Sequence, residues 1–288
     1  MRAETFVPGH ISCVFRPVRT DDVMSTGSLG LGIRTGLGCR ARVNTRDDGL
    51  IRILINGTES EAPITRLAIK SLGTGKGFDI HLEHELPMEQ GFGASASGTF
   101  AAALCVASLI GMDRIEAVKA SHMAECKLGG GLGDLPAINS GYGVPIREVA
   151  GVQGIAGKTA DSGLSFPDLT LIVFKEPLKT ESVLTDEAEM KKIIAAGDVA
   201  IAGFSEDRTI PGLFSVSNRF SEAIGLESEE IREALKAIRK EGYHGGMCML
   251  GNSIYTDLPM EKAQRMFSSA SLFKTSSYSG PIEVTRTE

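Results

Sequence analysis

A segment rich in glycine, alanine and serine leads directly into a long apolar run about a third of the way along the chain. The segment is PMEQGFGASASG at 87–98, and the run is TFAAALCVASLIG at 99–111. Such a loop exposes backbone N–H groups, and a helix that starts there adds the positive end of its dipole. Ser95, Ser97 and Thr99 offer the oxygen ligands that Mg²⁺ prefers. The segment alone predicts either a phosphate-binding loop or a plain glycine-rich turn into a buried helix.

Two well-known phosphate motifs do not occur here. A Walker A loop carries a lysine directly after its last glycine, and no lysine lies between Lys76 and Lys119. The dinucleotide fingerprint spaces its glycines as G-x-G-x-x-G, which the glycines at 91, 93 and 98 do not follow. Another glycine-rich stretch, GLGIRTG at 30–36, leads to a strand at Cys39 rather than to a helix. We therefore exclude a P-loop, disfavour a Rossmann domain and reject 30–36 as the main phosphate site.

Composition, charge and cysteine content narrow the class of protein. The chain has 288 residues, of which 42% are hydrophobic, so it can bury one large or two smaller cores. Its net charge of −6 and dispersed basic residues disfavour a nucleic-acid partner. The longest apolar run, 100–110, is about half the roughly 20 residues of a membrane span, and no charged-then-apolar leader opens the sequence. The five cysteines are an odd number without a C-x-x-C pair, which predicts reduced thiols and a cytoplasmic protein. The short apolar run predicts that the protein does not contact a membrane.

The first part of the chain is expected to contain strands followed by two helices. Strands are predicted at 4–7, 39–45, 50–55 and 78–86, with gaps at the glycines between 27 and 38. Helices are predicted at 95–110 and 114–128, the second beginning with a capping box of Asp113 and Glu116. Glu125 lies at the edge of the apolar face of that second helix. Its position alone favours a solvated carboxylate over one with a cationic partner.

The remaining sequence alternates strands and helices. Strands are expected at 169–174, 246–250, 253–256 and 282–285, and helices at 186–201, 211–225, 228–240 and 260–267. This pattern predicts an α+β sandwich. We place one domain at 1–161 and a second at 162–288.

Three glycine-bearing segments follow one another in a recognisable order: FVPGHISCVF, PMEQGFGASASG and GYHGGMCMLGNS. This order resembles the GHMP kinase superfamily, named for galactokinase, homoserine, mevalonate and phosphomevalonate kinases. The resemblance implies a two-domain α+β fold, with an N-terminal mixed α/β domain and a C-terminal ferredoxin-like α/β sandwich. The family's middle motif, P-x-x-x-G-L-G-S-S-A, is matched by Pro87, Gly91, Phe92, Gly93, Ala94, Ser95 and Ala96, where Ala94 replaces the first serine.

The resemblance also implies roles for particular residues. The loop, including Ser97, is expected to bind ATP, while Ser95 and Glu125 hold Mg²⁺. Asp134 is expected to be the catalytic carboxylate that approaches the acceptor hydroxyl, after the flexible turn GGGLG at 129–133. By position alone Asp134 would instead be the N-cap of a short helix that starts near Pro136.

Within the superfamily the chain is most similar to archaeal pantoate kinases. The likeness rests on PGHI at 8–11, GSLGLG at 27–32 and GMCMLGN at 246–252, although Leu29 stands where a basic residue is expected. It implies ATP-dependent phosphorylation of the 4-hydroxyl of (R)-pantoate to 4-phosphopantoate, in the synthesis of coenzyme A. The residues expected to bind pantoate are His10, Ser28, Arg34, Gly245 and Gly246.

Other interpretations of these residues stay open. His10 can be a hydrogen-bonded core histidine, Ser28 a turn residue and Arg34 a solvated surface charge. The chain as a whole can be another small-molecule kinase, of the homoserine, shikimate or mevalonate type, or a ligand-binding relative without activity. Many relatives form dimers, so a homodimer is compatible with the resemblance.

Overall fold

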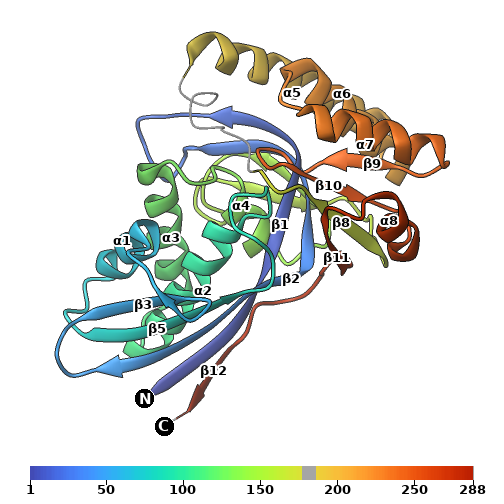
Figure 1. Ribbon diagram of the computed structural model, residues 1–288. Helices are drawn as coiled ribbons and strands as arrows, with labels where there is room; N and C mark the ends of the chain where they lie inside the picture. Colours follow the sequence, from blue (N-terminus) through green and yellow to red (C-terminus); the bar gives the residue numbers. More distant parts are fainter. Residues whose placement is uncertain (177–185, 288) are drawn as a thin grey trace.

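The computed structural model describes residues 1–176 and 186–287, which form two sheets flanked by helices (Figure 1). The first sheet has the strand order β12-β1-β2-β5-β3-β4, and β6 and β7 continue it from β2. Among its described strands, β3 and β5 form the one parallel pair. The strands are β1 (Arg2–Val18), β2 (Gly27–Arg46), β3 (Ile51–Ile55), β4 (Thr58–Glu59), β5 (Gly77–His84), β6 (Pro145–Val149), β7 (Lys158–Asp161) and β12 (Val284–Thr287).

Helices α1 (Pro63–Ser71), α2 (Ala94–Ile110), α3 (Arg114–Leu128) and α4 (Asp134–Asn139) gather on one face of the first sheet (Figure 1). Helix α2 is buried around nearly its whole circumference because its residues are small or apolar on every side. It ends at Gly111, whose left-handed backbone closes the helix. The two helices predicted from the sequence are confirmed, whereas the capping box is not. Asp113 precedes α3 without a side-chain cap bond, and Glu116 pairs with Lys119 instead.

The second sheet has the antiparallel order β11-β8-β10-β9. Its strands are β8 (Leu169–Val173), β9 (Gly245–Met247), β10 (Ser253–Thr256) and β11 (Ser271–Thr275). Helices α5 (Glu187–Glu206), α6 (Ile210–Ile224) and α7 (Glu229–Lys240) form a layer beside this sheet and the far ends of β1 and β2, and α8 (Met260–Met266) contacts β8 and β11 (Figure 1). The α+β class and the predicted alternation of strands and helices are confirmed.

The predicted gaps between the glycines at 27 and 38 are wrong, because β2 runs through all of them. The strand pairs with β1 over most of its length. At Gly38 an added Cβ would lie 2.1 Å from the carbonyl oxygen of Val7, and at Gly32 it would lie 2.0 Å from Nε2 of His10. These glycines allow residues of β1 to approach the β2 backbone closely, and they do not form turns.

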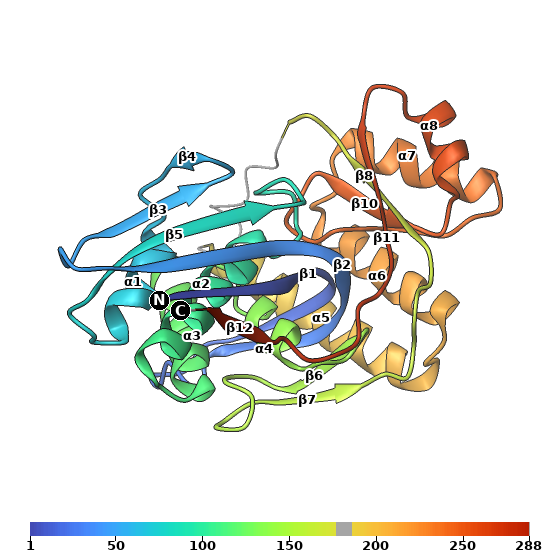
Figure 2. The ribbon, with the colours of Figure 1, turned by 90° about the horizontal axis from the view of Figure 1, so that it is seen from below.

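The chain crosses between the two sheets twice. It leaves the first sheet after β7 and returns at its end, where β12 pairs with β1 so that the termini lie close together (Figure 2). One core cluster joins β1 residues such as Ile11 and Val14 to Leu171 and Ile172 of the second sheet. The C-terminal segment thus belongs spatially with the first sheet, although the sequence-based division at 161 and 162 assigns it to the second domain.

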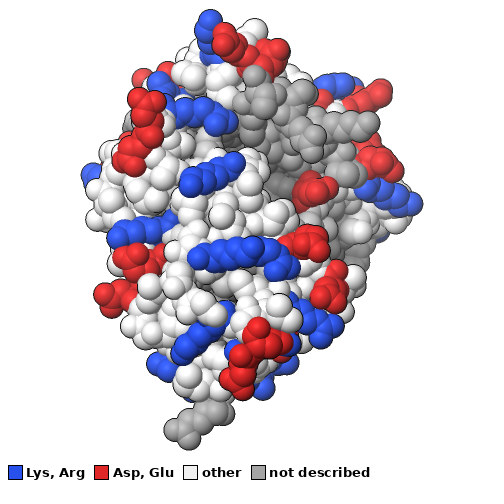
Figure 3. Space-filling model, turned by 90° about the vertical axis from the view of Figure 1, so that its left-hand side faces the viewer, with Lys and Arg blue, Asp and Glu red and all other residues white. Residues whose placement is uncertain are grey.

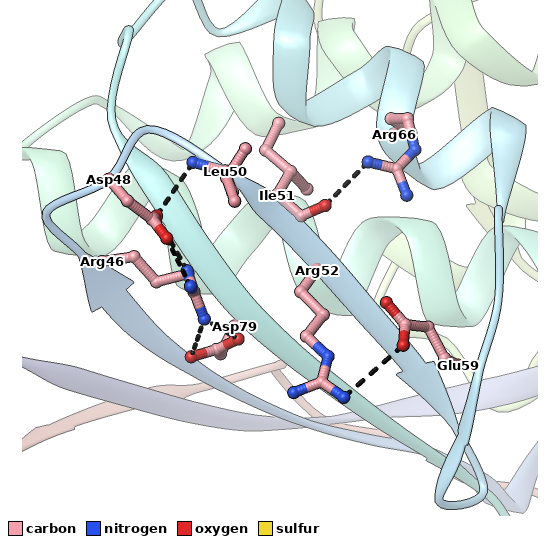
Figure 4. A network of polar contacts seen from close by, with 8 residues as sticks. All are labelled: Arg46, Asp48, Leu50, Ile51, Arg52, Glu59, Arg66 and Asp79. Carbon is pink, nitrogen blue, oxygen red and sulfur yellow. Dashed lines mark hydrogen bonds and ion pairs between the residues drawn. The ribbon is translucent and has the colours of Figure 1, made fainter.

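A network of polar contacts fixes the edge strands beside α1 (Figure 4). Arg46 donates to both carboxylate oxygens of Asp79 at 2.7 and 2.9 Å and also contacts Asp48. Arg66 of α1 donates to the carbonyl of Ile51 at 2.7 Å. These contacts hold α1 and β3 at the rim of the cavity described below.

The surface carries mixed charges. Basic and acidic side chains are interspersed on the face drawn in Figure 3, which shows no broad field of one sign. Across the described ranges, no helix combines the length and hydropathy needed to cross a membrane.

Candidate active site

A cavity of about 530 Å³ opens where the glycine-rich loop meets the turn before α4. One end is formed by apolar residues from β3, α1 and β5, and the other by β1 and the segment after β9. The lining includes Ser12, Phe15, Pro17, Ser28, Ile55, Ile64, Leu82, His84, Glu89, Gly91, Phe92, Gly93, Ala94, Ser95, Ala96, Gly131, Gly133, Asp134, Met249 and Leu250.

The loop presents the N-terminus of α2 to this cavity. Gly91 and Gly93 have φ angles of 79° and 60°, which favour glycine, and Gly93 directly precedes the helix. The first helical N–H groups have no partner within the helix, and no acidic side chain lies in the first turn. Six of the loop residues predicted to bind ATP line the cavity, Gly91 to Ala96. Pro87 and Ser97 do not, and the Ser97 hydroxyl donates to the carbonyl of Ala94.

The third glycine-bearing segment supports the loop from behind. The backbone N–H of Asn252 donates to Oε1 of Gln90 at 3.0 Å, and the Ser253 hydroxyl donates to the Gln90 carbonyl at 2.6 Å. A Cβ on Gly91 would lie 2.8 Å from the carbonyl oxygen of Cys248. The second half of the chain therefore fixes the position of the loop through hydrogen bonds to the backbone and side chain of Gln90 and through close packing on Gly91.

Ser95, which lines the cavity, contacts Glu125 behind it, although the two residues are 30 positions apart in the sequence. The Ser95 hydroxyl donates to Oε1 of Glu125 at 2.7 Å, and the N–H of Gly131 donates to Oε2 at 2.8 Å. Glu125 is only 1% exposed, and this burial raises the pKa of its carboxyl to about 7. The solvated position favoured by helical spacing is therefore wrong.

The donors around Glu125 suit a small hard cation. Across residues 1–176 and 186–287, no group of three or more His, Cys, Asp or Glu side chains converges as a metal site. The oxygen ligands that the protein offers a cation here are the Ser95 hydroxyl and the Glu125 carboxylate. Mg²⁺ commonly takes one or two protein oxygens and completes its shell with water and phosphate.

Asp134 lies at the start of α4 and faces the cavity. Its Oδ1 is 2.7 Å from Nδ1 of His10, and its side chain is 21% exposed. The N-cap position belongs to Gly133, without a side-chain bond, so the alternative role of Asp134 as an N-cap is wrong. A Cβ on Gly131 would lie 2.0 Å from Oδ2 of Asp134, so the turn approaches this carboxylate closely.

The residues predicted to bind the acceptor do not all come together. Ser28 lines the cavity, whereas His10 is fully buried beneath it and its backbone N–H donates to the carbonyl of Phe92 at 2.9 Å. Arg34 is also buried, and it donates to the carbonyls of Tyr278 and Gly280 in the C-terminal segment, at 3.2 Å each. It is therefore not a solvated surface charge.

Gly245 and Gly246 lie in β9, paired with β10, and are not among the cavity residues. A Cβ on Gly246 would lie 2.6 Å from the ring of Tyr255. Close packing against this ring explains why glycine stands there. The structure gives neither these two glycines nor Arg34 a place in the cavity wall.

Sequence reasoning missed Arg147. This residue lies on β6, is 1% exposed, and points one guanidinium nitrogen at Nε2 of His10, 3.4 Å away. Another donates to the carbonyl of Val14 at 3.3 Å, and Nε has no hydrogen-bond partner among the described residues. Burial lowers the pKa of Arg147 to about 10. In the sequence this arginine belongs to a short segment, PIREV, that carries no motif.

Replacing Gly32 by alanine should destabilise the protein, because the added Cβ would lie 2.0 Å from Nε2 of His10 and 2.6 Å from the carbonyl oxygen of Ile11. We expect a loss of about 1–3 kcal/mol or more in the free energy of unfolding, measured by urea titration. Gly36→Ala is the matched control, since its nearest atom would be 3.5 Å away in the same strand. Equal losses in the two variants would contradict this account.

Comparison with known proteins agrees with these findings. Residues 62–142 match the GHMP kinases N terminal domain. A pantoate kinase from Methanospirillum hungatei is 29% identical, over 88% of this chain and 86% of that protein. A pantoate kinase from Thermococcus kodakarensis is 28% identical, over 94% of each.

Solved structures show the same relationship. A phosphotransferase related to the CoA biosynthesis pathway superposes with a TM-score of 0.90 at 25% identity, over 99% of both chains. A galactokinase from Lactococcus lactis superposes with a TM-score of 0.70 at 15% identity, over 98% of this chain and 95% of the other, which is a likeness of fold. The loop, its supporting segment and these full-length likenesses agree with the resemblance to the GHMP kinases, whose N-terminal domain matches residues 62–142.

Proposed function

We propose that this protein is a pantoate kinase, which transfers the γ-phosphoryl group of ATP to the 4-hydroxyl of (R)-pantoate. The observation that carries the proposal is the position of Asp134, whose partly exposed carboxylate lines the same cavity as the N-terminus of α2 and Ser95, the hydrogen-bond partner of Glu125. A phosphate donor and a hydroxyl acceptor can therefore meet beside one carboxylate. The two similar pantoate kinases support the choice of acceptor.

The cavity has two ends that suit the two substrates. Ile55, Ile64 and Leu82 give one end an apolar lining, which suits a nucleobase. At the other end Phe15, Pro17 and Met249 lie near Ser12 and Ser28. Pantoate carries two methyl groups between its two hydroxyls, so it combines apolar and hydrogen-bonding surface in the same way.

The transfer needs mainly positioning and charge neutralisation. The acceptor oxygen attacks the γ-phosphorus, the bond to the bridging oxygen breaks and ADP leaves, while the hydroxyl proton passes to Oδ2 of Asp134. Backbone N–H groups at the start of α2 hold the phosphates. Ser95 and Glu125 would hold Mg²⁺, which neutralises phosphate charge when bound.

A coupled assay of ADP release tests the proposal. Turnover should be highest with (R)-pantoate among pantoate, homoserine, shikimate and mevalonate, and the product should be 4-phosphopantoate by mass spectrometry and ³¹P NMR. Turnover with another acceptor but not with pantoate would overturn the choice of substrate and keep the kinase. The cytoplasmic location and the homodimer stay predictions.

A further inference from the structure

Three side chains from distant parts of the chain form a line that ends at the cavity. Arg147 of β6 lies 3.4 Å from Nε2 of His10, and Nδ1 of His10 lies 2.7 Å from Oδ1 of Asp134. Arg147 and His10 are almost completely shielded from solvent, so water does not compete for these contacts. Only Asp134, the last of the three, lines the cavity.

Glycines make room for each part of this line. A Cβ on Gly32 would lie 2.0 Å from Nε2 of His10, and one on Gly30 would lie 2.8 Å from a terminal nitrogen of Arg147. On the other side, a Cβ on Gly133 would lie 2.8 Å from Nε of Arg147. The motif at 27–32 thus makes room for the His10 ring and the Arg147 guanidinium.

The chemistry of the three groups decides where the protons lie. A guanidinium has only donors, so the His10 nitrogen that faces Arg147 must offer its lone pair. The proton of a neutral His10 is then on Nδ1, where it is donated to Oδ1 of Asp134. A second proton on Nε2 would turn His10 into a cation pointing at another cation. The charged groups that act on His10 are Asp134, Arg147 and Arg34.

We propose that Arg147 is a positioning residue that acts through His10: it keeps Nε2 unprotonated, so that His10 is a neutral donor to Asp134 rather than a cation paired with it. Oδ1 is thereby engaged, and Oδ2 is left for the acceptor hydroxyl. A cationic His10 would hold the negative charge of Asp134 and make it a weaker base. Burial also lowers the pKa of His10, in the same direction. The catalytic consequence rests on the proposed kinase function, whereas the protonation state does not.

Nitrogen-15 NMR of histidine-labelled protein tests the protonation state without any substrate. The chain has five histidines, and His10→Asn identifies the His10 signals by their loss. In the parent and in Arg147→Lys, His10 should stay neutral with its proton on Nδ1 from pH 5.5 to 8. In Arg147→Met it should take up a second proton as the pH falls through this range. If that variant does not fold, Arg147→Gln serves the same purpose, because it too removes the charge.

Kinetics test whether Arg147 acts through His10. Arg147→Met should lower kcat at pH 6 by about tenfold or more while the KM values for acceptor and ATP change by less than about threefold. The His10→Asn variant keeps an N–H at the place of Nδ1 but cannot titrate. In that background Arg147→Met should therefore change kcat by less than about threefold.

Three results would overturn the proposal. The first is a His10 that stays neutral to pH 5.5 in both uncharged Arg147 variants. The second is a double variant, His10→Asn with Arg147→Met, in which the reductions in kcat caused by the two single substitutions multiply. The third is a rise in the acceptor KM with kcat unchanged, which would make Arg147 a binding residue. If no acceptor is turned over, the NMR result still decides the protonation state, and only the proposed function fails.

Discussion

Asp134→Asn should lower kcat by about 10²–10⁴-fold while ATP binding persists. The substitution keeps the shape of the side chain, and the amide oxygen can still accept the proton of His10 Nδ1, 2.7 Å away in the parent. What is lost is the carboxylate oxygen that takes the acceptor proton. Initial rates of ADP release and calorimetric titration with a non-hydrolysable ATP analogue measure the two quantities separately.

Asp113→Asn is the matched control for this variant. Asp113 is exposed and precedes α3 without a side-chain cap bond to the described helix, so this substitution removes one negative charge without breaking a cap. Its kcat should stay within about twofold of the parent, as expected of a surface substitution. An Asp134→Asn enzyme with the turnover of this control would remove Asp134 from the proposed mechanism.

Local sequence predicts the parts of this site that are built locally. The loop at 87–98 and helix α2 follow from small residues beside an unbroken apolar run, and both are present. The position of Glu125 could not be predicted in this way, because on α3 it lies only at the edge of the apolar face. Its burial depends on Ser95 and Gly131, which close over it from α2 and from the turn beyond α3.

The glycines of β2 and the buried arginines show a second limit of prediction from local sequence. Glycine in a sequence commonly indicates a turn, but Gly32 is there because His10 from the neighbouring strand needs the space. Arg34 and Arg147 look like solvated strand residues, and both are buried by segments that are distant in sequence. Only the three ordered motifs, through family resemblance, pointed to Ser95, Glu125 and Asp134 as one site.

The cavity must bind a highly charged donor with few charged groups of its own. Among its described lining residues there is no lysine or arginine, and Asp134 and Glu89 are acidic. The backbone N–H groups of α2 supply partial positive charge, of about half a unit at most. A bound cation at Ser95 and Glu125 would therefore supply a large part of the remaining positive charge. Substitution of Glu125 should accordingly change both the stability of the protein and the Mg²⁺ dependence of its activity.

Glu125→Gln should make the stability of the metal-free protein less sensitive to pH. Burial raises the pKa of Glu125 from 4.5 to about 7, so the folded state retains a proton that the unfolded state has already lost. The parent should accordingly lose stability as the pH rises from 4.5 to 7, by on the order of 3 kcal/mol from this group. Relative to the parent, the variant should become progressively more stable over this window, as measured by thermal unfolding in the presence of a chelator.

The same substitution should raise the Mg²⁺ concentration needed for half-maximal activity by about tenfold or more, because a neutral amide replaces the buried carboxylate beside Ser95. Added Mg²⁺ should stabilise the parent above pH 7 and have little effect on the variant, since binding to the folded state alone raises its stability. Glu116→Gln, at a partly exposed position on the same helix where the carboxylate pairs only with the surface Lys119 among the described residues, should alter neither property. If the Mg²⁺ titration curves of the parent and of Glu125→Gln coincide, the cation binds elsewhere. If the metal binds at Glu125, the two curves should differ most at a pH where the metal-free carboxyl is ionised.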